Sequence, residues 1–135
     1  MTLRINLRDG EKVVVNGAVL RAVGRTELCV ESSASVLRGR EIMAPGDADT
    51  PARQLYFHTM MAYIDPENVE AHQDRIVTAL QQVSTLLPTE EGQAARVSFA
   101  RQVASLQYYR ALADCRALMR LEEGVLAPAA VDAAG

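Results

Sequence analysis

The sequence predicts an α+β fold, in which an N-terminal five-stranded antiparallel β-module is followed by a C-terminal part of three to four helices. Two observations predict this order. Apolar and polar side chains alternate over most of the first forty residues, which is the period of a half-buried strand. From about residue 50 the apolar side chains recur at helical spacing instead. We therefore expect a basic β-sheet module over residues 1–46, a helical part over 47–123 and a disordered tail over 124–135.

Turn signals set the first three strands. Residues 3–8 alternate apolar and polar side chains, and Asp9-Gly10 ends this strand. Asn16-Gly17 is the strongest short signal for a β-hairpin, so it joins a second strand to a third. The two-residue loop fixes the register of that hairpin and places Lys12 opposite Arg21.

A three-residue loop, Gly24-Arg25-Thr26, is expected between the third and fourth strands. It sets Ala22 opposite Leu28, whereas a two-residue loop would set Ala22 opposite Glu27 and mix the two faces of the sheet. A fifth strand follows over about residues 34–37. The resulting apolar face, which the helices could cover, is made by Val13, Val15, Leu20, Ala22, Leu28 and Val30.

Capping signals, Thr50-Pro51 and Asp65-Pro66, mark the starts of the first two helices. Thr50 as N-cap and Pro51 at the first helical position predict a helix through Ile64. The apolar residues of this helix cover nearly its whole circumference, so we expect it to be buried or to lie at an interface. An amphipathic helix over about residues 66–87 follows it.

The end of the chain leaves two alternatives open. A third helix starts after Pro88-Thr89, and residues 108–119 either continue it or form a fourth helix after a kink near Ser105. Glu122-Glu123 lacks the favourable position of acids in the first turn of a helix and is expected to mark a solvated end.

The net charge of −3 hides an uneven distribution. Residues 1–40 hold seven basic and four acidic side chains, a local charge of +3, whereas residues 41–135 hold seven basic and thirteen acidic ones, a local charge of −6. The two parts therefore suit different partners. Cys29 and Cys115 show no metal or redox spacing and are expected to be free thiols in the cytoplasm. No apolar run is long enough to span a membrane, so no membrane partner is expected.

Basic side chains on the outer face of the sheet form the first candidate site. Lys12 and Arg21 are like charges directly across a strand pair, and such a pair is destabilising by up to about 1 kcal/mol. A phosphate bound between them would make their contribution to the stability favourable. Alternatively, Glu27 or Glu31 on the neighbouring strand neutralises Arg21.

A second basic cluster, Arg38-Gly39-Arg40, ends the fifth strand and is either an anion site or a solvated turn. RNA is the expected large anion. Specific RNA recognition usually adds aromatic stacking, but Tyr56 is the first aromatic residue in the chain. Arginine side chains and backbone groups of the protein are therefore expected to contact the RNA, including the edges of its bases.

No catalytic site, cofactor or metal site is expected. His58 and His72 stand fourteen residues apart without a third ligand at helical spacing. The sequence contains no nucleophile elbow and no phosphate-binding loop.

The first helix offers a second candidate surface. Phe57, Met60, Met61 and Tyr63 either line a groove for a partner helix, since methionine adapts to varied surfaces, or pack in the core.

Several motifs together resemble the flagellin-biosynthesis repressor family FlbT, from residue 3 to about residue 120. They are Leu-Arg-Ile-Asn-Leu-Arg-Asp-Gly-Glu-Lys (3–12), Val-Asn-Gly-Ala-Val-Leu-Arg (15–21), Val-Leu-Arg (36–38), Ala-Asp-Thr-Pro-Ala-Arg-Gln-Leu-Tyr-Phe (48–57), Tyr-Ile-Asp-Pro-Glu-Asn (63–68) and Tyr-Tyr-Arg-Ala-Leu (108–112). The resemblance implies a small cytoplasmic protein of flagellated alphaproteobacteria. It also implies an association with the 5′ untranslated region of flagellin mRNA and its destabilisation, and a link to flagellin and the small protein FlaF.

Residues 3–42 also resemble the RNA-binding regulator CsrA, more weakly. The matching positions are Arg8 in the first strand and Arg38 at the end of the fifth. That resemblance implies binding of GGA-containing RNA loops and a strand-exchanged homodimer. The extra residue Gly39 and the long helical part depart from the CsrA pattern.

The basic residues predict RNA binding, and the resemblance to FlbT implies a post-transcriptional repressor that binds the flagellin mRNA leader and promotes its degradation. The expected RNA-binding residues are Arg8, Lys12, Arg21, Arg38 and Arg40. The alternative is an adaptor or chaperone that binds flagellin or FlaF without touching RNA. A homodimer is compatible with both.

Overall fold

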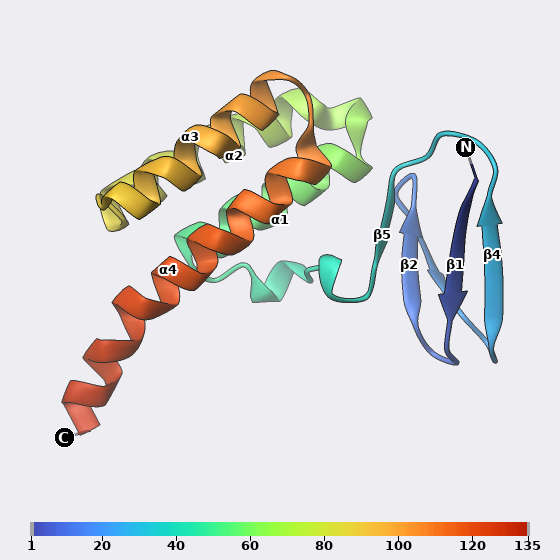
Figure 1. Ribbon diagram of the computed structural model, residues 1–135, viewed down its shortest axis with the longest axis horizontal. Helices are drawn as coiled ribbons and strands as arrows, with labels where there is room; N and C mark the ends of the chain where they lie inside the picture. Colours follow the sequence, from blue (N-terminus) through green and yellow to red (C-terminus); the bar gives the residue numbers. More distant parts are fainter. Residues whose placement is uncertain (1, 135) are drawn as a thin grey trace.

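The computed structural model describes the backbone of residues 2–134 and the side chains of residues 2–126. It confirms the α+β fold, with five strands and four helices in the described part of the chain (Figure 1). The strands are β1 (Leu3–Leu7), β2 (Lys12–Val15), β3 (Ala18–Arg21), β4 (Thr26–Val30) and β5 (Val36–Arg38). The helices are α1 (Pro51–Ile64), α2 (Val69–Leu86), α3 (Glu90–Ala104) and α4 (Tyr108–Ala134), with short 3-10 helices η1 (Gly39–Glu41), η2 (Pro45–Asp47) and η3 (Pro66–Asn68).

The strands form two antiparallel sheets, one of β1 and β4 and one in the order β3-β2-β5. The predicted register of the β2–β3 hairpin is confirmed, with Lys12 opposite Arg21. The predicted pairing of Ala22 with Leu28 is wrong, because β4 pairs with β1 and Leu28 lies opposite Ile5.

Hydrogen bonds at one end of the module explain why the chain changes sheets. The backbone N–H of Gly10 donates to the carbonyl of Ala22 at 2.8 Å, and the N–H of Ala22 donates to the carbonyl of Glu11 at 2.8 Å. The Asp9 carboxylate accepts the N–H of Gly24 at 2.8 Å, and Gly24 adopts a φ of 77°, which glycine reaches without steric cost. The end of β3 is therefore bound to the turn after β1, which directs β4 to β1.

The two sheets enclose a small core. Its buried side chains are Ile5, Leu7, Val13 and Ala22, with Val15, Leu28, Val30 and Val36 packed against them. Leu20 was expected in this set but is 46% exposed. The physical reason is the pairing of β4 with β1, which leaves β3 as an open edge strand.

The opposite face of the larger sheet packs against the helices. Val14 and Leu37 are 2% and 0% exposed and join the main core with Leu55 of α1. Because side chains alternate along a strand, Val14 shares its face with Lys12. The helices therefore cover part of the sheet face that carries Lys12. The face that carries Val13, which the sequence pattern makes available to the helices, is covered by β1 and β4 instead.

Two predicted helix starts are confirmed by their caps. The Thr50 hydroxyl accepts the N–H of Arg53 at 3.3 Å, and Pro51 occupies the first helical position. The Thr89 hydroxyl likewise accepts the N–H of Gly92 at 3.0 Å at the start of α3. Such side chains satisfy donors that the first turn of a helix leaves unpaired.

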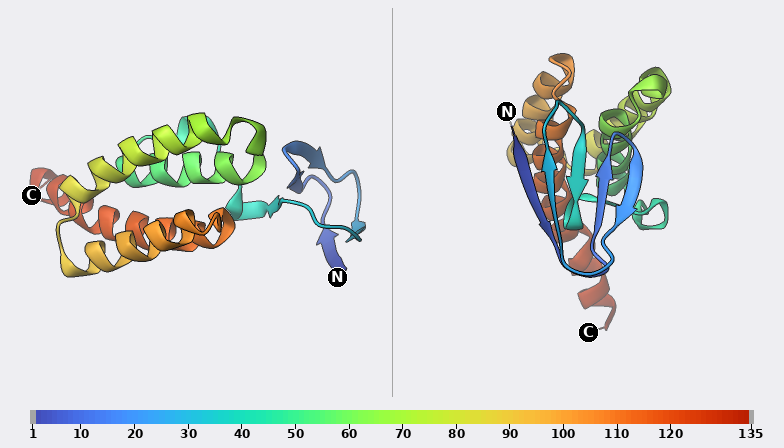
Figure 2. Two further views of the ribbon diagram at one scale, coloured as in Figure 1. Left: turned by 90° about the horizontal axis from the view of Figure 1, so that it is seen from above. Right: turned by 90° about the vertical axis from the view of Figure 1, so that its right-hand side faces the viewer.

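Of the two alternatives for residues 108–119, a separate fourth helix is correct. The Leu106 N–H donates to the Val103 carbonyl at 2.9 Å and the Gln107 N–H donates to the Gln102 carbonyl at 2.8 Å. These two bonds are those of a Schellman helix end, with Leu106 in the left-handed conformation at φ 60°. The chain then reverses, and α4 packs against α3 and α1 while α2 packs against α1 (Figure 2).

Helix α4 continues to Ala134 in the backbone, where the sequence predicts a disordered tail from residue 124. The side chains of residues 127–135 lie outside the described part.

The expectation of a solvated Glu122 is wrong, because this carboxylate caps another helix. Glu122 is 2% exposed. One of its oxygens accepts the Ala52 N–H at 2.8 Å, and the other accepts the Thr50 hydroxyl. The N-terminus of α1 offers unpaired N–H groups and a favourable dipole for this negative charge.

Replacing Glu122 with alanine should lower the free energy of unfolding by about 2–4 kcal/mol, since it leaves buried donors of α1 unpaired. The neighbouring Glu123 is exposed, so Glu123→Ala is the matched control and should change stability by less than about 0.5 kcal/mol. Urea denaturation measures both. Equal effects of the two variants would contradict the capping role.

The tip of the β2–β3 hairpin rests on the end of α1. A Cβ atom added to Gly17 would lie 2.9 Å from the backbone oxygen of Ile64, and Gly17 has a φ of 86°. Gly10 has a similar φ of 84° but nothing within 4 Å of the added atom. Glycine is therefore required at position 17 for two reasons, the positive φ and the close approach of the two backbones.

Gly17→Ala should consequently destabilise the chain more than Gly10→Ala, by about 1–3 kcal/mol, because both variants strain the backbone but only the first overpacks a contact. Thermal or urea unfolding of the two variants measures the difference. If the two variants lose the same stability, the backbone at Gly17 does not make a close contact with the end of α1.

Candidate nucleic-acid interface

A single glutamate positions the end of β5, where the Arg38-Gly39-Arg40 cluster lies. One carboxylate oxygen of Glu41 accepts the backbone N–H of Arg38 at 3.0 Å. The other oxygen accepts the hydroxyl of Tyr109, from the start of α4. The backbone carbonyl of Glu41 accepts the hydroxyl of Tyr56, from α1, at 2.7 Å. Glu41 therefore connects β5 to two helices.

A tyrosine holds the other end of β5. The backbone N–H of Val36 donates to the hydroxyl of Tyr63, from α1, at 3.0 Å. Val36 and Arg38 are two residues apart, so their N–H groups point to the same edge of the strand. Tyr63 and Glu41 thus satisfy the edge of β5 that does not face β2, and they fix the strand against the helices.

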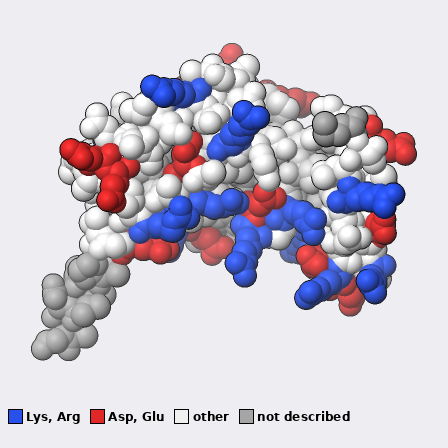
Figure 3. All heavy atoms as spheres, in the orientation of Figure 1, with Lys and Arg blue, Asp and Glu red and all other residues white. Residues whose placement is uncertain are grey.

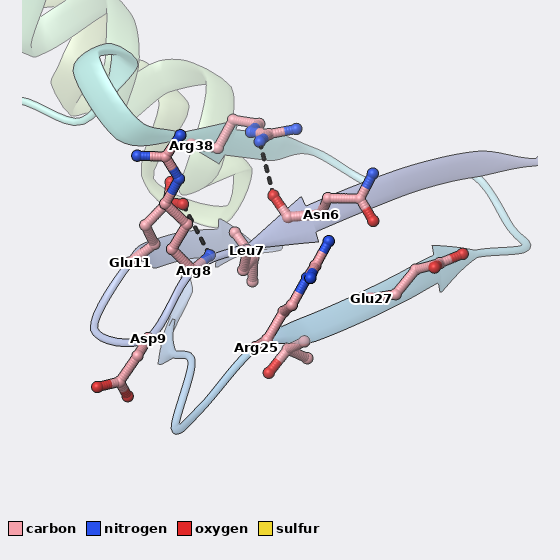
Figure 4. A pocket seen from close by; sticks show the side chains of 9 residues that line it. Asn6, Leu7, Arg8, Asp9, Glu11, Arg25, Glu27 and Arg38 are labelled. Atoms are coloured by element: carbon pink, nitrogen blue, oxygen red, sulfur yellow. Dashed lines mark hydrogen bonds between the residues drawn. The ribbon is translucent and has the colours of Figure 1, made fainter.

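A cleft of about 1180 Å³ lies beside this strand, at the end of the β-module (Figure 4). Its basic residues come from three segments that are distant in sequence: Arg8 follows β1, Arg25 precedes β4 and Arg38 ends β5. The remaining lining residues are Asn6, Leu7, Asp9, Glu11, Thr26 and Glu27.

The acidic side chains of the cleft are largely engaged with backbone donors. The carboxylate of Glu11 accepts the N–H of Arg8 at 2.8 Å, and that of Asp9 accepts the N–H of Gly24. Within the described residues, no ion pair involves Arg8, Arg25 or Arg38. The guanidinium groups of Arg8 and Arg25 therefore remain available to an anion, whose phosphate or carboxylate geometry matches their planar donors.

Arg38 has a structural role as well. One of its guanidinium nitrogens donates to the backbone carbonyl of Asn6 in β1 at 3.0 Å, which links the two sheets (Figure 4). Its side chain lies between β5 and β1, at the upper rim of the cleft. Removing Arg38 would thus disturb the module as well as the charge of the cleft.

The structure brings only some of the predicted RNA-binding residues together. Arg8 and Arg38 share the cleft, whereas Lys12 and Arg21 form a separate exposed pair on the β2–β3 hairpin and Arg40 is exposed in η1. The proposed neutralisation of Arg21 by a neighbouring strand does not occur through β4, because β4 pairs with β1.

Local sequence patterns do not single out Arg25 as a site residue. The sequence places it in the loop before β4, and its approach to Arg8 depends on the pairing of β4 with β1. No local pattern in the sequence signals that pairing.

Basic side chains extend beyond the β-module. On the face shown in Figure 3, Lys and Arg side chains follow one another from the helical part to the β-module, with acidic side chains between them. On the helical side, Arg116 of α4 donates to the Tyr56 hydroxyl at 3.2 Å, with its guanidinium carbon 5.6 Å from the centre of the Tyr56 ring. Basic and acidic side chains are therefore less separated in the folded protein than they are along the sequence.

The four residues predicted to bind a partner have different positions. Met60 is 3% exposed, and its sulfur accepts the N–H of Met43 at 3.4 Å, so it packs in the core. Tyr63 is engaged with β5, while Phe57 and Met61 are half-buried. Met61 also lines a cavity of about 520 Å³ between the hairpin tip and the end of α1.

The histidines and cysteines are not among the residues that line the cleft. His72 lies 2.9 Å from the Asp65 carboxylate, and burial lowers the pKa of His58. Burial raises the pKa of Cys115, which holds this thiol neutral. Among the residues that the structure describes, no group of three or more His, Cys, Asp and Glu side chains is arranged to hold a metal ion. None of the described helices is long and apolar enough to cross a membrane.

Comparison with known proteins identifies the family. A model of the flagellar protein FlbT matches residues 3–126, which is most of the chain. This chain belongs to the FlbT family. The match includes the β-module and the helices up to residue 126.

Curated relatives support the assignment to FlbT. The chain is 34% identical to a probable flagellum biosynthesis repressor protein FlbT of Caulobacter sp. strain K31, over 91% of this chain and 95% of the relative. It is also 34% identical to the flagellum biosynthesis repressor protein FlbT of Caulobacter vibrioides, over 91% and 88% of the two chains. A probable FlbT of Allorhizobium ampelinum is 33% identical, over 97% and 91%. No solved structure matches this chain, and the resemblance to CsrA stays a prediction.

The contact between Tyr109 and Glu41 in this FlbT-family chain has a measurable signature. The hydrogen bond to the Glu41 carboxylate, with partial burial, raises the pKa of Tyr109 to about 12. Because the folded pKa exceeds the unfolded value of about 10, the bond stabilises the fold fully below pH 10. This contribution is lost as the pH rises through about 12.

Titration of tyrosine absorbance should therefore show a late component that is smaller in Tyr109→Phe, where Tyr56, whose pKa burial also raises, still titrates late. Glu41→Gln should move this transition toward pH 10, since the carboxylate is the main cause of the shift. A tyrosine titration that is the same in wild type and in Glu41→Gln would show that the two side chains do not interact.

Proposed function

We propose that this protein is a post-transcriptional repressor of flagellum biosynthesis that binds the 5′ untranslated region of flagellin mRNA. The observation that carries the proposal is the cleft in which Arg8, Arg25 and Arg38 converge. The names of the FlbT relatives support the repressor role. Binding in the cytoplasm would lower translation by covering the ribosome site or by promoting degradation of the message.

The residues of the cleft suit an unpaired, looped segment of RNA. Arginine forks bind phosphate in a bidentate manner, and the Asn6 side chain offers an amide donor and acceptor for a base edge. Asp9, Glu11 and Glu27 repel phosphate at non-matching positions, which favours a defined path over non-specific binding. Lys12, Arg21 and Arg40 provide further positive charge outside the cleft.

The test is binding of the purified protein to a flagellin leader RNA at several salt concentrations. Affinity should fall with salt, with a logarithmic slope of about −0.7 for each phosphate neutralised on single strands. Arg8→Ala combined with Arg25→Ala should weaken binding and flatten the slope by about 1.4, if each arginine contacts one phosphate. These two residues are better targets than Arg38, whose side chain also links the sheets.

The matched control is Arg75→Ala combined with Arg101→Ala, which removes the same charge from exposed sites on α2 and α3. It should leave the affinity close to that of the wild type. Absence of binding by the wild type would overturn the proposal of direct RNA contact. Equal losses in the two double variants would overturn the assignment of the cleft.

An adaptor function is the second candidate. Helix α1 keeps Phe57 and Met61 half-buried, and Met61 lines a separate cavity beside the hairpin tip. A helical segment of flagellin or FlaF could pack there, and any effect on the message would then be indirect. Stoichiometric co-purification of flagellin or FlaF that is lost in Phe57→Ala combined with Met61→Ala would favour this candidate.

A further inference from the structure

The β-module contains no aromatic residue, yet an exposed tyrosine stands beside its basic cluster. Tyr109 belongs to the first turn of α4 and is 46% exposed. Its hydroxyl shares the carboxylate of Glu41 with the backbone N–H of Arg38. The fold thus brings an aromatic ring from the far end of the sequence to the Arg38-Gly39-Arg40 cluster.

The ring of Tyr109 is held in place from two directions. Its hydroxyl donates to Glu41, and its ring centre lies 5.3 Å from that of Tyr63, with 41° between the ring planes. Tyr63 is fixed in turn by its bond to the N–H of Val36. Tyr109 is therefore oriented before any ligand arrives, although nearly half of its surface stays exposed.

A purely structural role, in which the Tyr109 hydroxyl clamps α4 to Glu41, does not by itself account for this exposure. The hydroxyl alone makes the hydrogen bond, whereas the exposed apolar surface of the ring gains nothing from water. An oriented aromatic face next to arginine side chains is the arrangement by which proteins stack unpaired bases while holding the backbone phosphates. Arg38 is bonded through its backbone to the same carboxylate as Tyr109, and the charge of Arg116 also acts on Tyr109.

We propose that Tyr109 stacks an unpaired base of the bound RNA, next to the cleft of Arg8, Arg25 and Arg38. This inference rests on the proposed RNA binding and assigns the base-stacking residue to α4 rather than to the sheet. The RNA then spans both parts of the molecule. The helical part contributes directly to RNA recognition, which the acidic charge of its sequence does not suggest.

The experiment uses leader RNAs of the flagellin message that carry 2-aminopurine at one unpaired position each. The fluorescence of this base is quenched when it stacks, and the chain contains no tryptophan to obscure it. One position should be quenched on binding to the wild type. Tyr109→Leu should abolish that quenching and weaken binding by about 5- to 100-fold, as expected for the loss of one stacked base.

Two further variants separate stacking from the clamp. Tyr109→Phe loses the bond to Glu41 but keeps the ring, so it should retain most of the quenching and affinity. Val97→Ala changes an apolar residue of similar exposure on α3 and serves as the control for surface changes. Circular dichroism checks that each variant is folded.

The outcomes distinguish the two levels of the proposal. If the wild type binds no leader RNA, both the proposed function and this inference fail. If Arg8→Ala with Arg25→Ala weakens binding but Tyr109→Leu does not, RNA binding stands and the stacking role is overturned. If Tyr109→Phe loses as much as Tyr109→Leu, the tyrosine acts only as a clamp. Loss of flagellin or FlaF binding in Tyr109→Leu, with RNA binding unchanged, would assign the ring to a protein partner.

Discussion

The Glu41 carboxylate is the interaction on which the arrangement of this molecule depends. It receives hydrogen bonds from the Arg38 backbone and the Tyr109 hydroxyl, while the carbonyl of the same residue receives the Tyr56 hydroxyl. These groups come from β5, α4 and α1. Glu41 is half-buried, so water competes less with its bonds than at an exposed site. Glu41 thus joins the basic end of β5 to two helices, while Tyr63 fixes the other end of the strand.

The β-module relies on the helices because it is small. Among the described residues, only Ile5, Leu7, Val13 and Ala22 are buried between its two sheets. This is little for a unit that must offset the entropy of ordering about forty residues. The second face of the larger sheet supplies Val14 and Leu37 to the helical core. The two parts of the sequence are thus successive layers of one structure, which agrees with a FlbT match that spans both.

This layering changes the meaning of the charge distribution. Along the chain, positive charge concentrates in the strands and negative charge in the helices. In space, basic side chains of both parts occupy one face of the molecule (Figure 3), and Tyr109 of α4 meets the end of β5 through Glu41. Under the proposed RNA binding, a ligand that follows the arginines from the cleft would therefore reach the helices, and the strands and helices would act as one binding surface.

Local signals in the sequence determined much of the fold. Asn16-Gly17 determined a hairpin and its register, and Thr50-Pro51 determined where α1 begins. Alternation located β2 but not its burial, because Val13 and Val14 are both buried, one on each face of the sheet. Local signals did not determine that β4 pairs with β1, that Glu122 caps α1, or that Arg25 approaches Arg8. Each of these joins residues far apart in the chain, and its energy comes from groups that meet only after the layers have packed. Local patterns thus account for the strands, for the starts of α1 and α3 and for the charges, whereas the packing of the layers decides which arginines share a cleft.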